Sequence, residues 1–176
     1  MSDFAVKFIV GSNGAGKTKL LKSEAQKMIA TIPRDRIATN LHEYPLKRRI
    51  SVERVDALNR NEEFKLGLDY EEVESVDGRT LQLPAQDFSD NFRDILTLLC
   101  SDHDWLLLDE PEVNLSFHEL CLLRNAFIAL LPFYRGGYII THSIELLVVA
   151  KEFLWCDWDS LSLIGEDDFY ERIDTM

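Results

Sequence analysis

The sequence predicts an α/β fold, in which helices flank a mainly parallel central sheet and a small antiparallel hairpin lies beside it. The first observation is that short apolar runs rich in Val, Ile, Leu and Phe alternate with longer segments whose apolar residues recur at helical spacing. The second is that one run, WLLLDEP at residues 105–111, is fully apolar up to its two acids, as in a strand covered on both faces. The chain of 176 residues, 46% hydrophobic and 28% charged, has the length and composition of a globular domain. We expect residues 1–176 to form one domain.

The first elements expected are a strand, a glycine-rich loop and a helix. Residues 4–10 (FAVKFIV) form an apolar run that ends at a glycine, which predicts a buried strand. Residues 17–30 carry apolar side chains at helical spacing and predict an amphipathic helix. The pattern over residues 37–68 is mixed: it contains a short strand at 37–41, then a basic loop and a polar stretch compatible with a helix.

The middle of the chain predicts the hairpin. Residues 72–76 and 80–83 flank the pair Asp77-Gly78, a sequence that favours a tight turn between antiparallel strands. A helix is then expected over residues 87–100, because its apolar residues follow a helical period.

The last third repeats the alternation of strands and helices. Residues 105–111 (WLLLDEP) read as a central parallel strand that ends in two acids. A helix is expected over 116–131, a strand over 137–141 (GYIIT) and a third long helix from 144 to about 152. This order of elements favours a parallel sheet with helical crossovers.

Charge and cysteine content exclude several classes of protein. Lys and Arg total 19 against 31 Asp and Glu, and a net charge of −12 disfavours broad adhesion to nucleic acid or anionic membranes. The basic run at residues 47–49 reads as a solvated loop rather than a phosphate contact. Apolar stretches are shorter than the roughly 20 residues of a membrane span, and we expect a cytoplasmic protein. The dispersed Cys100, Cys121 and Cys156 fit reduced thiols.

The loop after the first strand predicts a phosphate site and hence a P-loop NTPase fold. Its sequence, GSNGAGKT, fits Gly-x-x-x-x-Gly-Lys-Thr between a strand and a helix. The glycines let backbone N–H groups converge on phosphate oxygens at a helix N-terminus. We expect Lys17 to neutralise the β and γ phosphates and the Thr18 hydroxyl to ligate Mg²⁺. The expected nucleotide-binding residues are Gly11, Ser12, Asn13, Gly14, Ala15, Gly16, Lys17, Thr18 and Lys19.

Two acids and a histidine at the ends of later strands complete the expected site. Asp109 would hold Mg²⁺ through its water shell, and Glu110 would orient or deprotonate the attacking water. The alternative is that both acids only cap a strand, but burying two carboxylates without a cation is costly. His142 directly follows the strand at residues 137–141, where it would sense the γ-phosphate.

The segments GSNGAGKT, LLLDEPE and IITHS, in that order, resemble the ATP-binding cassette (ABC) class of P-loop ATPases. Within that class they resemble the non-transporter branch of SMC, RecF and OLD-type proteins, which belongs to the AAA ATP-binding family. The resemblance implies that Asp109 is the Walker B aspartate, Glu110 the catalytic glutamate and His142 the switch histidine. It also implies that residues 113–116 form the D-loop.

One departure from this resemblance concerns the signature segment. The family carries Leu-Ser-Gly-Gly, which caps the γ-phosphate of the opposite subunit in a head-to-tail dimer. The candidate here is DFSDNF, which keeps Ser89 as a nucleotide contact but has Asp90 and Asn91 in place of both glycines. Either hydrolysis is slow or depends on a partner, or another segment plays this part.

Other family features are absent or ambiguous. The family normally has an antiparallel subdomain before the first strand, but only Met1 to Asp3 precede the strand expected here, so the expected contact to the base is open. The Q-loop glutamine has three weak candidates: Asn40, Gln82 and Gln86. The stretch between GSNGAGKT and LLLDEPE is too short for the long coiled coil of SMC proteins.

The sequence therefore favours a small soluble ABC-type ATPase that binds and hydrolyses Mg·ATP. Turnover would switch its association with itself, as an ATP-dependent homodimer, or with a separate effector protein. Direct contact with nucleic acid is not expected, given the acidic balance. The first alternative is a nucleotide-binding regulator or scaffold with little hydrolysis, and the second is a small P-loop kinase.

Overall fold

The computed structural model describes residues 5–11, 14, 16–41, 49–60, 70–74, 78, 80–84, 88–157 and 160–174. In this part of the chain the main sheet has six strands and a second sheet has two. The main-sheet strands in spatial order are β2 (Ile37–Thr39), β5 (Trp105–Asp109), β6 (Gly136–Ile140), β1 (Val6–Val10), β7 (Glu152–Asp157) and β8 (Ser160–Gly165). The helices are α1 (Lys17–Thr31), α2 (Val52–Asn59), α4 (Asp90–Leu99), α5 (Phe117–Leu130), α6 (Ile144–Leu147) and α7 (Glu166–Asp174), with 3₁₀ turns η1 (Arg34–Arg36) and η2 (Leu131–Phe133).

The main sheet is mostly parallel, as the sequence predicts. β1 lies between β6 and β7 and is parallel to both. β5 is parallel to β2 on one side and β6 on the other. Among the described strands of this sheet, only β8 runs antiparallel, paired with β7. The carboxyl ends of β5, β6 and β1 therefore meet at one edge.

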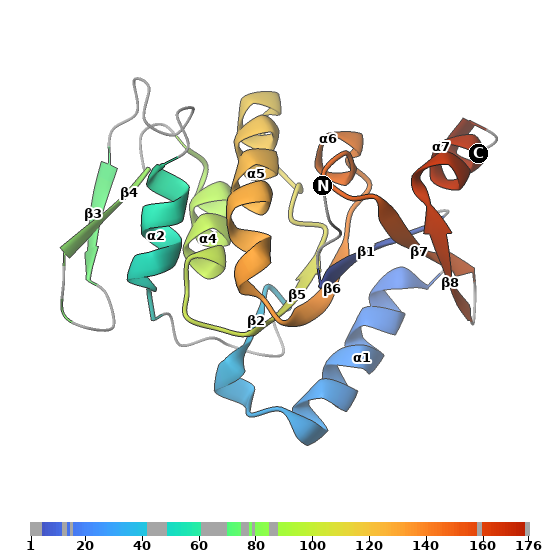
Figure 1. Cartoon of the computed structure of the whole chain (residues 1–176), viewed down its shortest axis with the longest axis horizontal. Coiled ribbons are helices and arrows are strands. Elements are labelled where there is room, and N and C mark those ends of the chain that lie inside the picture. Colours follow the sequence, from blue (N-terminus) through green and yellow to red (C-terminus); the bar gives the residue numbers. More distant parts are fainter. Residues whose placement is uncertain are drawn as a thin grey trace.

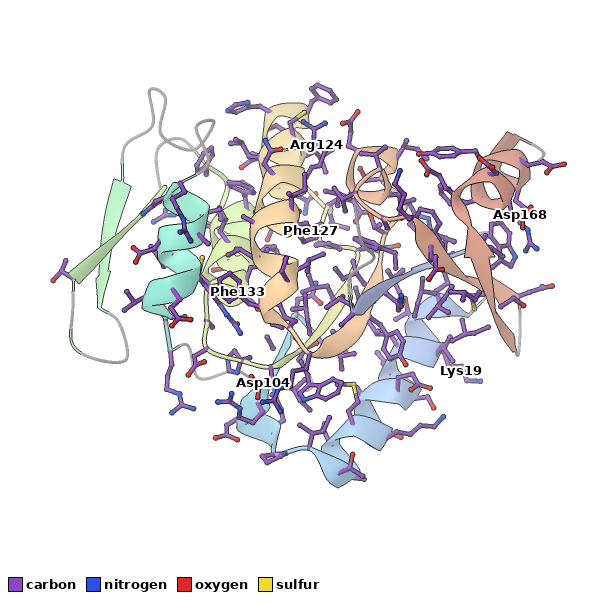
Figure 2. All side chains as sticks on the ribbon, viewed as in Figure 1. Lys19, Asp104, Arg124, Phe127, Phe133 and Asp168 are labelled. Carbon is purple, nitrogen blue, oxygen red and sulfur yellow. The ribbon has the colours of Figure 1, made fainter. Side chains whose placement is uncertain are left out.

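Helices cover both faces of the sheet because successive strand residues point to opposite sides. Figure 1 shows α1 on one side, and α2, α4, α5 and α6 on the other. Ile9 of β1 packs in the cluster that holds the buried face of α1, whereas its neighbour Phe8 packs in the larger cluster beneath the other helices. Phe127 of α5, labelled in Figure 2, meets Phe8 edge-on with ring centroids 6.0 Å apart.

The predicted hairpin is confirmed. β3 (Tyr70–Glu74) pairs antiparallel with β4 (Thr80–Pro84), and Glu74 lies opposite Thr80. Gly78, in the connection, has a φ of 82°, a conformation that glycine adopts without strain. Asp77 of the expected turn lies outside the described residues.

The long helix expected from residue 144 to about 152 is wrong. α6 ends at Leu147, and the chain enters β7 at Glu152, where Phe153 pairs with Phe8 of β1. In this run Leu146, Leu147, Val149 and Ala150 are at most 5% exposed, whereas Ile144 and Val148 are each 44% exposed. An apolar run this short does not separate helix from strand by its period. β7, β8 and α7 have no counterpart among the elements that the sequence predicts.

The three cysteines are free thiols, and Cys100 and Cys156 are buried, which agrees with the expectation of reduced thiols. In the basic run at residues 47–49, the guanidinium of Arg49 lies 3.8 Å from the carboxylate of Asp35. Among the described residues, no helix combines the length and apolar character needed to cross a membrane.

Candidate nucleotide site

The expected site residues gather at the carboxyl edge of the sheet. The phosphate loop follows β1, Asp109 ends β5, and His142 lies two residues beyond β6. Because β6 pairs with both β1 and β5, these three chain segments leave the sheet side by side. Ligands of open α/β sheets bind at this edge.

The described part of the phosphate loop has the backbone that an anion cradle needs. Gly16 is the N-cap of α1 with a φ of 84°, and Gly14 has a φ of 82°. At Gly11, a Cβ would lie 2.5 Å from the backbone oxygen of Cys156 in β7, so only glycine fits between the loop and this strand. Ser12, Asn13 and Ala15 lie outside the described residues, and their roles stay predictions.

Lys17, the first residue of α1, reaches back over the loop. Its ammonium donates a hydrogen bond to the Gly11 oxygen at 2.9 Å, and the residue is only 6% exposed. Burial lowers the pKa of Lys17, and the nearby Cys156, Glu110 and Asp109 oppose this effect. Lys17 is therefore a cation held close to both acids of the DEP segment.

Thr18 and Asp109 meet across the site. The Thr18 hydroxyl lies 3.4 Å from Oδ1 of Asp109, a long hydrogen bond. Burial raises the pKa of Asp109, the Thr18 hydrogen bond lowers it, and the carboxylates of Glu110 and Glu112 raise it further. A cation beside Asp109 would relieve this repulsion.

The residues present fit Mg²⁺. Magnesium takes hard oxygen ligands, often one or two protein groups completed by water and phosphate, and a hydroxyl beside a carboxylate supplies such a pair. The described residues contain no group of three or more His, Cys, Asp or Glu that could hold a metal by themselves. A site that shares its cation with nucleotide phosphates needs no such group.

Glu110 and His142 face each other at the open edge. Nε2 of His142 lies 2.9 Å from Oε1 of Glu110, and the side chains are 42% and 40% exposed. Glu110 has a φ of 46°, uncommon for a residue with a side chain, and its N–H donates to the Ile140 oxygen at 2.8 Å. This turn directs the carboxylate toward the loop that carries His142, where water has access to it.

Asn40 is bound to the last residue of β5. Its Nδ2 donates to the Asp109 oxygen at 2.8 Å, and its Oδ1 accepts the Asp109 N–H at 2.9 Å. Of the three Q-loop candidates, Asn40 is thus the one held beside Asp109. Gln82 lies in β4 of the separate hairpin sheet, and Gln86 is outside the described residues.

Ser89, the retained residue of the signature candidate, is held within its own chain. It caps α4, where its hydroxyl accepts the Phe92 N–H at 3.3 Å. Its hydroxyl and its N–H both donate to Oε2 of Glu119, at 2.9 and 2.8 Å. A contact from Ser89 to nucleotide would therefore compete with Glu119. Lys19, labelled in Figure 2, lies on the exposed side of the first turn of α1.

The motifs alone did not identify the buried partners of these residues. The position of Asn40 gave a weak signal, since it directly follows a short strand. Glu119 had a clear local signal: Ser116 and Glu119 have the spacing of a capping box, and both bonds of that box are present in α5. Its second set of bonds, to Ser89, joins residues 30 positions apart and has no local signature.

Comparisons with known proteins support the fold. No protein-family model matches the chain, and no curated protein matches it. A solved structure described as the ATP-binding subunit of an ABC transporter matches with a TM-score of 0.53 at 15% sequence identity. The match covers 98% of this chain and 83% of that one. The fold is thus a P-loop NTPase fold of the kind found in an ABC ATP-binding subunit.

Proposed function

We propose that residues 1–176 act as one ABC-type P-loop ATPase domain that binds and hydrolyses Mg·ATP. The observation that carries the proposal is that Lys17, the Thr18–Asp109 pair and the Glu110–His142 pair face one edge of the sheet. These side chains supply a phosphate-neutralising cation, a hard oxygen pair and a carboxylate that can act on water. The ABC-type fold supports the same assignment.

Each residue would have a separate role. Lys17 would leave the Gly11 oxygen for the β and γ phosphates, while the N-terminus of α1 provides backbone donors. Thr18 and Asp109 would hold Mg²⁺, which supplies charge neutralisation for the transferred phosphoryl group when bound. Glu110 would accept a proton from, or orient, the attacking water. His142 would hold Glu110 through the 2.9 Å contact and report the γ-phosphate.

Hydrolysis would switch association of the domain with a second copy or with an effector protein. The catalytic pair is about two-fifths exposed, so the edge that carries it is open to a partner. The segment at Ser89 would reach the partner's nucleotide only after releasing Glu119. This bond supports slow or partner-dependent turnover.

A second candidate is a nucleotide-binding regulator with little hydrolysis. It is favoured by the signature segment, where Asp90 and Asn91 replace the two glycines. A carboxylate at Asp90 would repel a γ-phosphate that approached it closely. The two functions differ in turnover rather than in nucleotide binding.

The deciding experiment substitutes Glu110→Gln. We expect this variant to bind Mg·ATP as the wild type does and to lose turnover by about 10²- to 10⁴-fold, the usual contribution of a general base. Nucleotide affinity, steady-state phosphate release and light scattering with Mg·ATP are measured together. The control is Asp168→Asn, which also replaces a carboxylate by an amide, at an exposed residue of α7 that Figure 2 labels.

Two results would contradict the proposal in different ways. Turnover that survives in Glu110→Gln would exclude Glu110 as the catalytic base. Wild-type protein that binds Mg·ATP without turnover, alone and at high concentration, would favour the regulator. An ATP-dependent dimer of Glu110→Gln would support self-association as the switched state.

A further inference from the structure

Glu112 lies two residues after Glu110, in the turn between β5 and α5. This turn is closed by a hydrogen bond from the Val113 N–H to the Glu110 oxygen at 3.2 Å. No role was expected for Glu112 from the sequence. Its carboxylate nevertheless makes two of the shortest side-chain bonds near the site.

Both oxygens of Glu112 bind the loop that carries His142. Oε1 accepts a hydrogen bond from the Thr141 hydroxyl at 2.8 Å, and Oε2 accepts the backbone N–H of His142 at 2.8 Å. Thr141 is only 2% exposed, and its hydroxyl also accepts the Ser143 N–H at 3.0 Å. The start of the loop after β6 is thus fixed at three successive residues.

These bonds close a ring through the catalytic pair. From Glu110 the chain runs through Pro111 to Glu112, whose carboxylate holds the backbone of His142. The imidazole of His142 then returns to the Glu110 carboxylate. We propose that Glu112 is a positioning residue, which fixes the backbone of His142 so that its imidazole stays in register with Glu110.

The charge of Glu112 supports positioning over simple loop packing. The carboxylate lies near those of Asp109 and Glu110, where a third negative charge is unfavourable. A loop that only needed filling would tolerate an apolar side chain there. A carboxylate supplies two strong acceptors for two donors and fixes both direction and distance.

The inference rests on the proposed ATPase function, and a double-mutant cycle tests it. Glu112→Ala should lower kcat by about 10- to 100-fold, as misplacement of a catalytic group does, with little change in KM for ATP. In a His142→Ala background, Glu112→Ala should have almost no further effect, because Glu112 acts through His142. Glu112→Gln keeps an acceptor for the His142 N–H and should retain most of the turnover. Glu171→Ala, at an exposed glutamate of α7, is the control.

Amide hydrogen exchange at His142 gives a readout that does not need turnover. Exchange of this N–H should be faster in Glu112→Ala than in the wild type and close to wild type in Glu112→Gln. If exchange at His142 changes in this way but the protein has no ATPase turnover, the positioning bond is supported and the proposed function is contradicted. Equal losses of kcat from Glu112→Ala in both backgrounds, or unchanged exchange at His142, would overturn the inference.

Discussion

Asn40 shows how one side chain can complete a strand end. β2 stops at Thr39, whereas β5 continues to Asp109. The Asn40 amide occupies the position that another strand residue would have taken, and it satisfies both backbone groups of Asp109. The backbone of the expected Mg²⁺ residue is therefore fixed although the neighbouring strand has ended.

Replacing Asn40 by Ala should cost both stability and activity. The change leaves the N–H and C=O of Asp109 without these partners, a loss of about 1–3 kcal/mol in the free energy of unfolding. Turnover should fall by about tenfold or more, the usual effect of losing a group that orients a metal ligand. Urea unfolding and ATPase assays measure the two effects. Gln26→Ala, which removes an exposed amide from α1, should leave both near wild type.

At this scale the sequence predicts the residues better than their partners. Motifs identify Lys17, Asp109, Glu110 and His142 because strand, loop and helix signals surround each one. Their roles stay proposals. The bonds of Asn40 to Asp109 join positions 69 apart, and those of Glu112 to its loop join positions 29 and 30 apart. Pairings at such separations depend on the order of strands, which local patterns do not contain.

Two helices are joined through their first turns by one carboxylate. Glu119 forms the capping box of α5 with Ser116 and also accepts two hydrogen bonds from Ser89, the N-cap of α4. Nearby, the Asn91 amide donates to the Val113 oxygen at 3.4 Å. The signature candidate is therefore tied to the loop that follows Asp109 and Glu110.

The charge of Glu119 should appear in the pH dependence of stability. Burial favours the neutral form, but hydrogen bonds from Ser116 and Ser89 outweigh it and hold the pKa below the usual 4.5. A lowered pKa stabilises the fold above pH 4.5, and that contribution is lost as the pH falls through the folded-state value. Glu119→Gln should therefore lower the free energy of unfolding by about 1.5–3 kcal/mol at neutral pH. The difference in the free energy of unfolding between this variant and the wild type should become smaller in acid.

Urea unfolding of wild type and Glu119→Gln across this pH range measures the effect. Glu171→Gln removes a carboxylate from the exposed side of α7 and should not reproduce the narrowing. If the difference in the free energy of unfolding stays constant from neutral pH into acid, the side chain of Glu119 stabilises the fold through packing and not through its charge.

Element prediction succeeded where periodicity or turn sequences were strong. The amphipathic α4 and the hairpin were both found, with bounds that shifted by a few residues. The helix predicted over residues 144–152 was wrong because the apolar residues there belong first to a short helix and then lead into a strand. Residues 152–157 form a strand by pairing with β1, a tertiary feature.

At the scale of the whole molecule, topology determines which motifs meet. The alternation of strands and helices predicts a parallel sheet, and the motifs predict the strand ends that matter. The spatial order β2-β5-β6-β1-β7-β8 was not predictable, since it separates consecutive strands such as β1 and β2. That order places the phosphate loop, His142 and Asp109 at the carboxyl ends of three adjacent strands.

Net charge gives the last prediction, which concerns self-association. Two copies of a chain with a formal charge of −12 repel each other at long range, and salt screens that repulsion. In the Glu110→Gln variant at saturating Mg·ATP, raising salt from about 50 to about 300 mM should therefore strengthen the dimer several-fold. Sedimentation velocity measures the dissociation constant, and saturating nucleotide separates this effect from weaker ATP binding in salt. A dimer that weakens with salt would instead mean that opposite charges meet across the interface. The exposed Lys19 beside the phosphate loop would then be the first residue to replace.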